Sequence, residues 1–260
     1  MGRLRPLLPV PSEGEWTASF PGGMRLRLDA AELVQRDYLF GLYERLELRL
    51  VRRLMSNGRD FVDVGAHIGF YTVAAALACR DAGGRVLAFE PNPVSRTQLL
   101  QNLRLNDVDA EVVPSAASDR LRRGLLRVPN TPDTSWSSLE QRTFVEGEPY
   151  PVEMTTIDAE VQKRDLRPAM VKIDVEGHEL AALQGMRATL AADRPVVVCE
   201  VGEHTAEAAA ASLAETGYRA FRVWSGRLRT SDVVGPGTYN VLFVPEEKID
   251  VVAEALGRLA

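Results

Sequence analysis

The stretch FVDVGAHIGFYTVAAALACR, residues 61–80, decides the fold. The run FVDV is short, apolar and β-branched, as in a buried strand, and the alanine-rich run after Gly69 suits a helix packed on a sheet. Glycines such as Gly65 and Gly69, placed between a strand and a helix, let backbone N–H groups approach a ligand closely. The stretch therefore predicts a strand, a ligand-binding turn and a helix.

The same alternation continues along the chain. Strand patterns occur in RVLAFE (85–90), AEVVPSAAS (110–118), AMVKIDVEG (169–177) and RPVVVCEVG (194–202). Helix patterns occur in PNPVSRTQLLQNLRLN (91–106), HELAALQGMRATLAAD (178–193) and AEAAAASLAETG (206–217). This alternation predicts an α/β domain with a parallel sheet. The closely spaced runs 218–226 and 239–245 are expected to add one antiparallel strand.

The alternation of strand and helix patterns divides the chain into three parts. Residues 1–58 form an N-terminal extension, in which apolar residues at helical spacing predict one amphipathic helix over 33–55 on the substrate side. Residues 59–246 form the core, interrupted at about 121–158 by a Pro-, Thr- and Ser-rich insertion that predicts a β-hairpin. Residues 247–260 predict a C-terminal helix.

Composition limits the partners. A formal net charge of −5 and a pI near 5.4 give no global basic field for nucleic acid or anionic lipid. No run approaches the roughly 18 apolar residues of a membrane span, and prolines interrupt the first apolar run. Cys79 and Cys199 lie in apolar runs, which is typical of reduced core thiols. We expect a cytoplasmic protein with a small-molecule partner, no nucleic acid and no membrane.

The spacing of the glycine turn distinguishes between nucleotide ligands. A dinucleotide turn has G-x-G-x-x-G, whereas this turn has D-x-G-x-x-x-G, with Asp63 ahead of Gly65. An acid there suits the ammonium group of S-adenosylmethionine and repels a diphosphate. Glu90 ends the next strand, where it can accept hydrogen bonds from ribose hydroxyls. The alternative for the glycine turn is a purely structural role. The alternative for Glu90 is a solvated charge at the end of a strand.

A second constellation follows the insertion. Lys172, Asp174 and Glu176 share one face of a strand, where three charges are costly unless they are paired or serve a site. His178 begins the next helix and offers a base whose reference pKa is near 6.5. Glu200 ends the neighbouring strand and is expected to face the same cleft. The alternative is a structural ion-pair cluster.

The motifs FVDVGAHIGFYTVAAA, VLAFEPNP, NLRLN, AASD and above all VKIDVEGHELAALQG resemble the FkbM family of S-adenosylmethionine-dependent methyltransferases, over about residues 61–200. The resemblance implies the Rossmann-like class I methyltransferase sheet, seven strands with the last antiparallel and helices on both faces. It also implies donor-binding roles. Asp63, Gly65 and Gly69 would hold the methionine part, with His67 inside the turn, Glu90 would hold the ribose, and Ser118 with Asp119 would flank the adenine.

Family resemblance also implies O-methylation of a natural product, polyketide or sugar (EC 2.1.1.-). An alcohol is a poor nucleophile, and a positioned base contributes roughly 10²–10⁴-fold. His178 is the favoured base. Asp174 would orient it or the donor, Lys172 would stabilise a developing oxyanion, and Glu200 would face the same site.

Two alternatives remain for the chemistry. Asp174, Glu176 and Glu200 offer oxygen ligands for Mg²⁺, which would lower the pKa of the acceptor hydroxyl. We favour a site without metal, because His178 supplies a base. The other alternative is a non-catalytic SAM-binding module.

Substrate recognition is assigned to the segment TPDTSWSSL, residues 131–139. Trp136 and Ser137 combine stacking with hydrogen bonding, as a sugar or polyketide ring requires, and Glu176 is placed beside them. The alternative is a simple surface loop. The helix predicted over 33–55 would cover the cleft, pack on the sheet or form the seam of a homodimer.

Overall fold

The computed structural model describes residues 14–39, 45–129, 137–140, 147–202, 205–224, 227–230 and 239–257. The strands are β1 (Glu15–Ser19), β2 (Arg25–Asp29), β3 (Asp60–Val64), β4 (Val86–Phe89), β5 (Glu111–Val113), β6 (Ala116–Ala117), β7 (Arg122–Pro129), β8 (Gly147–Thr155), β9 (Pro168–Ile173), β10 (Val196–Val201), β11 (Tyr218–Trp224), β12 (Arg227–Thr230) and β13 (Tyr239–Pro245). The α-helices are α1 (Leu33–Leu39), α2 (Arg45–Met55), α3 (Phe70–Cys79), α4 (Pro93–Leu105), α5 (Ile157–Lys163), α6 (Glu179–Gln184), α7 (Arg187–Asp193), α8 (Ala206–Ala214) and α9 (Ile249–Leu256). Two 3-10 turns, η1 (Pro21–Gly23) and η2 (Glu246–Lys248), complete the described elements.

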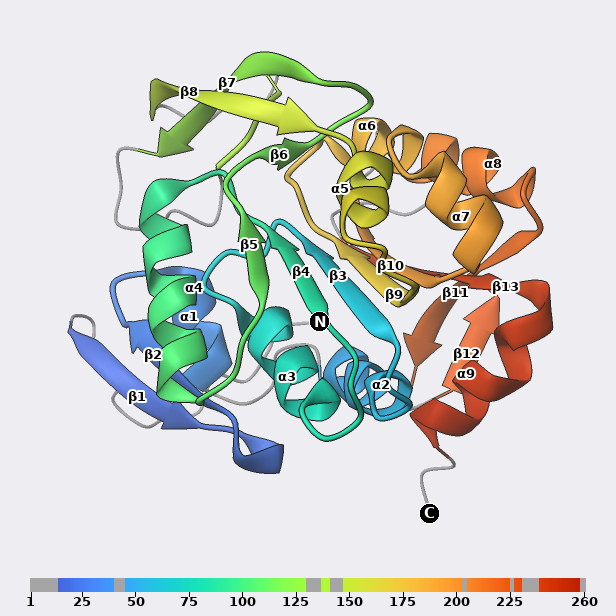
Figure 1. The fold of residues 1–260 in the computed structure, drawn as a ribbon, viewed down its shortest axis with the longest axis horizontal. Helices are drawn as coiled ribbons and strands as arrows, with labels where there is room; N and C mark the ends of the chain where they lie inside the picture. The colour runs from blue at the N-terminus through green and yellow to red at the C-terminus, as the bar shows by residue number, and fades with distance from the viewer. Residues whose placement is uncertain are drawn as a thin grey trace.

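The central sheet has the order β12-β11-β13-β10-β9-β3-β4-β5 within the described residues (Figure 1). Strands β3, β4, β5, β9 and β10 are parallel to their neighbours on that side, and β13 is antiparallel to both β10 and β11. The mostly parallel sheet with a late antiparallel strand is therefore confirmed. The strand number differs from the expected seven, because β12 folds back on β11 as an additional edge strand.

Helices cover both faces of the sheet (Figure 1). Side chains of α2, α3, α4 and α9 form one buried apolar cluster, and those of α5, α6, α7 and α8 form the other. Successive residues of β3 alternate between them, with Phe61 in the first cluster and Val62 in the second. This two-sided burial explains why the core strands have continuous apolar patterns.

Two predicted helices are divided. The helix predicted over 33–55 is represented by α1 and α2, and residues 40–44 between them lie outside the described residues. The helix predicted over 178–193 is interrupted at Gly185, where an added Cβ atom would overlap the carbonyl oxygen of Ser118. The junction of α6 and α7 therefore packs directly against the loop after β6.

The insertion contains an antiparallel pair, β7 and β8, and β6 pairs with β8 as a third strand. The N-terminal extension begins with the hairpin β1–β2, which the helical pattern did not indicate.

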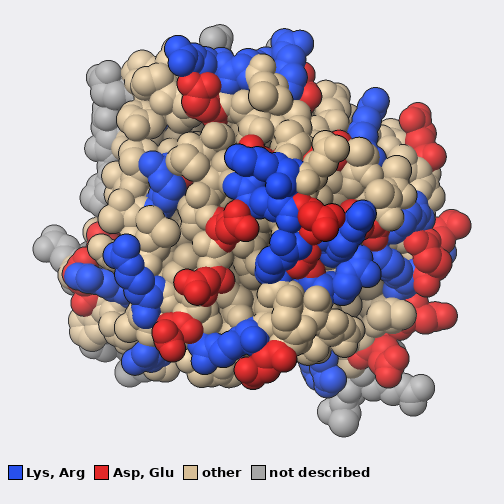
Figure 2. Space-filling view, in the orientation of Figure 1, with Lys and Arg blue, Asp and Glu red and all other residues tan. Residues whose placement is uncertain are grey.

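None of the described helices combines the length and the apolar character needed to cross a bilayer. Acidic and basic side chains are interspersed over the face of the molecule in Figure 2. Cys79 and Cys199 are buried free thiols, and burial raises the pKa of both.

Candidate active site

The glycine turn joins β3 to α3. Gly65 has φ of 82°, and an added Cβ atom there would overlap the carbonyl oxygen of Asp174. Gly69 has φ of 91°, and its added Cβ atom would overlap the Leu99 side chain. Only glycine satisfies both the left-handed backbone and the close neighbours. The backbone of the turn is thereby held against the end of β9.

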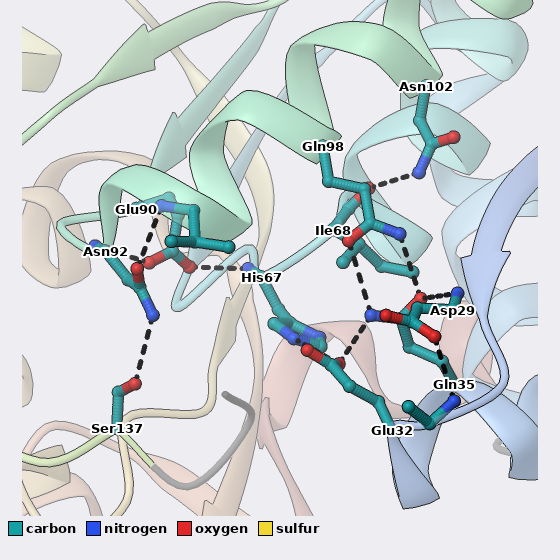
Figure 3. A network of polar contacts seen from close by, with 12 residues as sticks. Asp29, Glu32, Gln35, His67, Ile68, Glu90, Asn92, Gln98, Asn102 and Ser137 are labelled. Atoms are coloured by element: carbon teal, nitrogen blue, oxygen red, sulfur yellow. Dashed lines mark hydrogen bonds and ion pairs between the residues drawn. The ribbon is translucent and has the colours of Figure 1, made fainter. Parts of the chain in front are cut away.

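Glu90 lies directly after β4 and is only 6% exposed. Its Oε2 accepts a hydrogen bond from the backbone N–H of His67 at 2.6 Å, and its Oε1 accepts one from the N–H of Asn92 at 2.8 Å (Figure 3). Burial raises the pKa of Glu90 to about 7. Each carboxylate oxygen has a second lone pair, so the group can still accept ligand hydroxyls.

A pocket opens at the carboxyl ends of β3, β4 and β9, and we call it the turn pocket. Its lining includes six predicted site residues, Gly65, His67, Glu90, Ser137, Asp174 and Glu176. Its apolar wall includes Phe89, Ala117 and Leu126. The turn pocket thus combines the carboxyl groups of Glu90, Asp174 and Glu176 with an apolar wall.

Residues 137–140 form a strap over this pocket. The Nδ2 of Asn92 donates to Ser137 Oγ at 3.2 Å on the side of β4 (Figure 3). The Oγ of Ser138 donates to the carbonyl oxygen of Glu176 at 2.8 Å on the side of β9. The strap therefore connects two loops that contribute to the lining of the turn pocket.

His178 is 5% exposed and is hydrogen-bonded through both ring nitrogens. Its Nδ1 lies 2.8 Å from Glu140 Oε1 in the strap, and its Nε2 lies 3.0 Å from the Oγ of the buried Ser118. Ser118 Oγ also donates to Asp119 Oδ1 at 3.0 Å. Among the described residues that line the turn pocket, His178 does not occur. Its role as a base stays a prediction that requires release of one of these contacts.

Buried Lys172 forms an ion pair with Asp174, which lines the pocket. Lys172 is 1% exposed, and its Nζ lies 3.1 Å from Asp174 Oδ2 and 3.2 Å from Asn240 Oδ1. The negative charge of Asp174 and burial raise the pKa of Glu200, which is hydrogen-bonded to Asp174. Burial opposes ionisation of Asp174, but Lys172 and Glu200 together hold its pKa below the ordinary value. Of the two hydrogen-bonded carboxyl groups, Asp174 is therefore the carboxylate and Glu200 carries the proton.

Asp63 is buried near the end of β3, outside the described lining of the turn pocket. It is 2% exposed, its Oδ2 accepts a hydrogen bond from Thr72 Oγ1 at 2.5 Å, and burial raises its pKa to about 6. Thr72 takes one oxygen of this carboxylate, and the contact of Asp63 with a ligand ammonium group stays a prediction.

The alternative metal ligands are close together. Carboxylate oxygens of Asp174, Glu176 and Glu200 lie within 4.8 Å of one another. A magnesium ion prefers such oxygen ligands, although a protonated Glu200 must first lose its proton.

Of the residues predicted to bind the substrate, Trp136 lies outside the described residues, whereas Ser137 lines the turn pocket.

Sequence reasoning missed Glu32, in the N-terminal extension. Glu32 is 4% exposed, and its Oε2 lies 3.3 Å from His67 Nε2 and accepts a hydrogen bond from Gln35 at 2.5 Å (Figure 3). It also missed Glu140 and Asn92. Of these, only Asn92 has a local signal, since asparagine before proline is typical of a helix N-cap, and its side chain does cap α4.

The sheet order, the glycine turn and the buried Glu90 together define the class I methyltransferase architecture. The family model described as the methyltransferase FkbM domain matches residues 63–220, more than half of the chain. The chain therefore belongs to the FkbM methyltransferase family.

Several solved structures are similar to this chain. Methyltransferase FkbM from Methylobacillus flagellatus KT is 21% identical over 71% of this chain, with a TM-score of 0.47, and this chain covers only 43% of that protein. TYW2 from M. jannaschii, solved in complex with AdoMet, is 16% identical, with 91% and 87% of the two chains covered and a TM-score of 0.43. A ribosomal protein L11 methylase from Lactobacillus delbrueckii subsp. bulgaricus is 14% identical, with 77% and 76% covered and a TM-score of 0.46. A comparison with curated protein sequences finds no match.

Proposed function

We propose that the chain transfers a methyl group from S-adenosylmethionine to a hydroxyl oxygen of a small molecule. The observation that carries the proposal is Glu90, fixed by two backbone N–H groups beside the glycine turn, in a pocket with an apolar wall. The wall fits an adenine ring, and Glu90 fits the ribose hydroxyls. When bound, the donor supplies a methyl group on a sulfonium sulfur that needs no further activation.

The chain's own residues then have to orient the acceptor and remove its proton. Asp174 lines the turn pocket as a carboxylate, and Lys172 and Glu200 fix its position. As the acceptor oxygen gains the methyl group, its hydroxyl proton passes to Asp174, so Asp174 replaces His178 as the favoured base. A carboxylate of low pKa is a weak base, which suits a proton that leaves late in the transfer.

The test is calorimetric titration with S-adenosylhomocysteine and, separately, with NAD. We expect the first compound to bind and NAD to give no heat. Glu90→Ala should weaken binding at least tenfold, because a charge-assisted hydrogen bond contributes roughly 1.5–3 kcal/mol. The matched control is Glu207→Ala, an exposed glutamate of α8. Binding of NAD alone, or equal effects of both variants, would reject the assignment.

The methylated atom needs a second measurement. The chain is incubated with S-adenosylmethionine that carries a labelled methyl group and with a panel of small molecules bearing a free hydroxyl, a free amine or both. We expect the labelled methyl group on the hydroxyl oxygen of the acceptor. Release of S-adenosylhomocysteine with amine-only acceptors would show that the enzyme methylates nitrogen instead. Binding of the donor without turnover on any member of a broad panel would favour the non-catalytic module.

A further inference from the structure

A second cavity lies away from the turn pocket, on the N-terminal side of the molecule. It is lined by the tip of the β1–β2 hairpin, the end of α1, one face of α2 and the first residue of α3. Four arginines of α2 line it, Arg45, Arg49, Arg52 and Arg53. Their spacing places them on one side of the helix, because residues three, four, seven and eight apart share a face. We call it the arginine cavity.

The described lining of this cavity contains four arginines and no acidic residue. In the parts of the chain that the structure describes, no carboxylate forms an ion pair with any of these four guanidinium groups. Elsewhere the arginines that form ion pairs have close partners, as with Arg194 and Glu247 at 2.9 Å, and the two charges are interspersed on the face in Figure 2. Four cations around one cavity favour an anion between them.

Two of the arginines also have structural contacts. Arg52 donates to the carbonyl oxygen of Pro21, and burial lowers the pKa of its guanidinium. Arg49 lies against Gly257 at the carboxyl end of α9. Arg45 and Arg53 are exposed and have no such contact in the described residues, so they are the arginines available to a ligand.

Aromatic side chains also line the arginine cavity. Phe20, Tyr38 and Phe70 belong to its lining. Tyr38 stacks on Phe70 with ring centroids 4.3 Å apart, and Phe20 meets Phe70 edge to face at 5.8 Å. These rings would face an apolar ligand body held beside the arginines.

We propose that the arginine cavity binds the phosphate group of a small-molecule phosphate monoester with an apolar or aromatic body. Guanidinium groups match phosphate oxygens with paired hydrogen bonds, and the rings match the attached body. This binding does not depend on the proposed methyl transfer.

The probes are phenyl phosphate, inorganic phosphate and phenol, each titrated calorimetrically into the full chain. Phenyl phosphate should bind more tightly than inorganic phosphate, and phenol should bind least. The double variant Arg45→Gln/Arg53→Gln should weaken phenyl phosphate at least tenfold and leave S-adenosylhomocysteine affinity within twofold. The matched control is Arg104→Gln, an exposed arginine of α4 that does not line the cavity.

Three results would overturn the proposal: no heat with phenyl phosphate at millimolar concentration, equal weakening in the double variant and the control, or displacement of phenyl phosphate by S-adenosylhomocysteine. If the unmodified chain does not bind S-adenosylhomocysteine, the proposed function is rejected instead.

Discussion

The Nε2 atom of His178 lies 3.0 Å from the Oγ of Ser118, although the two residues are 60 positions apart in the chain. Since the other ring nitrogen contacts Glu140 in the strap, one imidazole connects the loop after β6, the loop after β9 and the strap. The loop after β9 and the strap line the turn pocket, and the loop after β6 directly follows Ala117, which also lines it. The contacts of His178 therefore hold together segments at the edge of the pocket, which predicts a positioning role.

His178→Ala should therefore weaken S-adenosylhomocysteine at least tenfold, as expected for the loss of hydrogen bonds that hold the strap. Glu140→Gln should reproduce a large part of this change, because it removes the charge from the same connection. Calorimetry measures the affinity of both variants for S-adenosylhomocysteine, and steady-state kinetics measures their kcat. If His178→Ala instead binds the donor normally and kcat falls by roughly 10²–10⁴-fold while Glu140→Gln is unaffected, His178 is the base after all.

Donor affinity should increase with pH through the pKa of Glu90. Burial raises that pKa from 4.5 to about 7, so the folded protein binds the proton more tightly than the unfolded chain between these values. The stability that this carboxyl group contributes is therefore lost as pH rises from about 4.5 to about 7. Ribose hydroxyls favour the ionised form, so S-adenosylhomocysteine should bind about tenfold more tightly at pH 8 than at pH 6.

Glu90→Gln is the control for this pH dependence. The variant should bind more weakly at every pH and lose the tenfold change. Asp63 also titrates in this range, with a pKa of about 6, and it remains in the variant. An unchanged pH profile in Glu90→Gln would assign the effect to Asp63.

Gly65→Ala and Gly83→Ala form a matched pair. Both glycines have φ of 82°, but an added Cβ atom meets the Asp174 carbonyl at Gly65 and nothing within 4 Å at Gly83. Both variants should lose about 1–2 kcal/mol of folding stability through the left-handed backbone. Gly65→Ala should lose roughly 1–3 kcal/mol more through overlap, together with donor binding. Equal urea midpoints and equal affinities for the two variants would contradict the close packing of the turn against β9.

Turnover should persist in excess EDTA. The proton on Glu200 and the buried pairing of Asp174 with Lys172 both oppose metal binding by the three carboxylates. The measurement is the rate of S-adenosylhomocysteine release with EDTA and after addition of Mg²⁺. Turnover that stops with EDTA and returns with Mg²⁺ would establish Asp174, Glu176 and Glu200 as metal ligands.

Features that depend on local pattern could be predicted from the sequence. The strand, turn and helix around Gly65 and the position of Glu90 after its strand follow from short apolar runs and glycine spacing. The antiparallel strand near the C-terminus follows from two close strand patterns. The break at Gly185 could not be predicted, because its cause is a backbone contact with Ser118 from another part of the chain.

The environment of each candidate side chain was harder to predict. The sequence predicts His178 as a base, but it does not indicate the contacts of its ring nitrogens with Glu140 and Ser118, which are 38 and 60 residues away. It predicts Asp63 at the ligand, and no local pattern indicates the hydrogen bond that Thr72 donates to it. Long-range contacts of this kind fix protonation and orientation, and a single sequence does not encode them in any periodic signal.

The contact between Glu32 and His67 has a consequence for how the chain unfolds. The family match begins at residue 63, yet the extension before it is joined to the core by buried polar bonds. Asn102 on α4 and Asn106, the residue that caps its C-terminus, accept hydrogen bonds from the backbone of β2 at 2.7 and 2.8 Å. A fragment starting at β3 would leave these amides without their partners. The extension and the core therefore form one cooperative unit, and the intact chain should melt in a single transition.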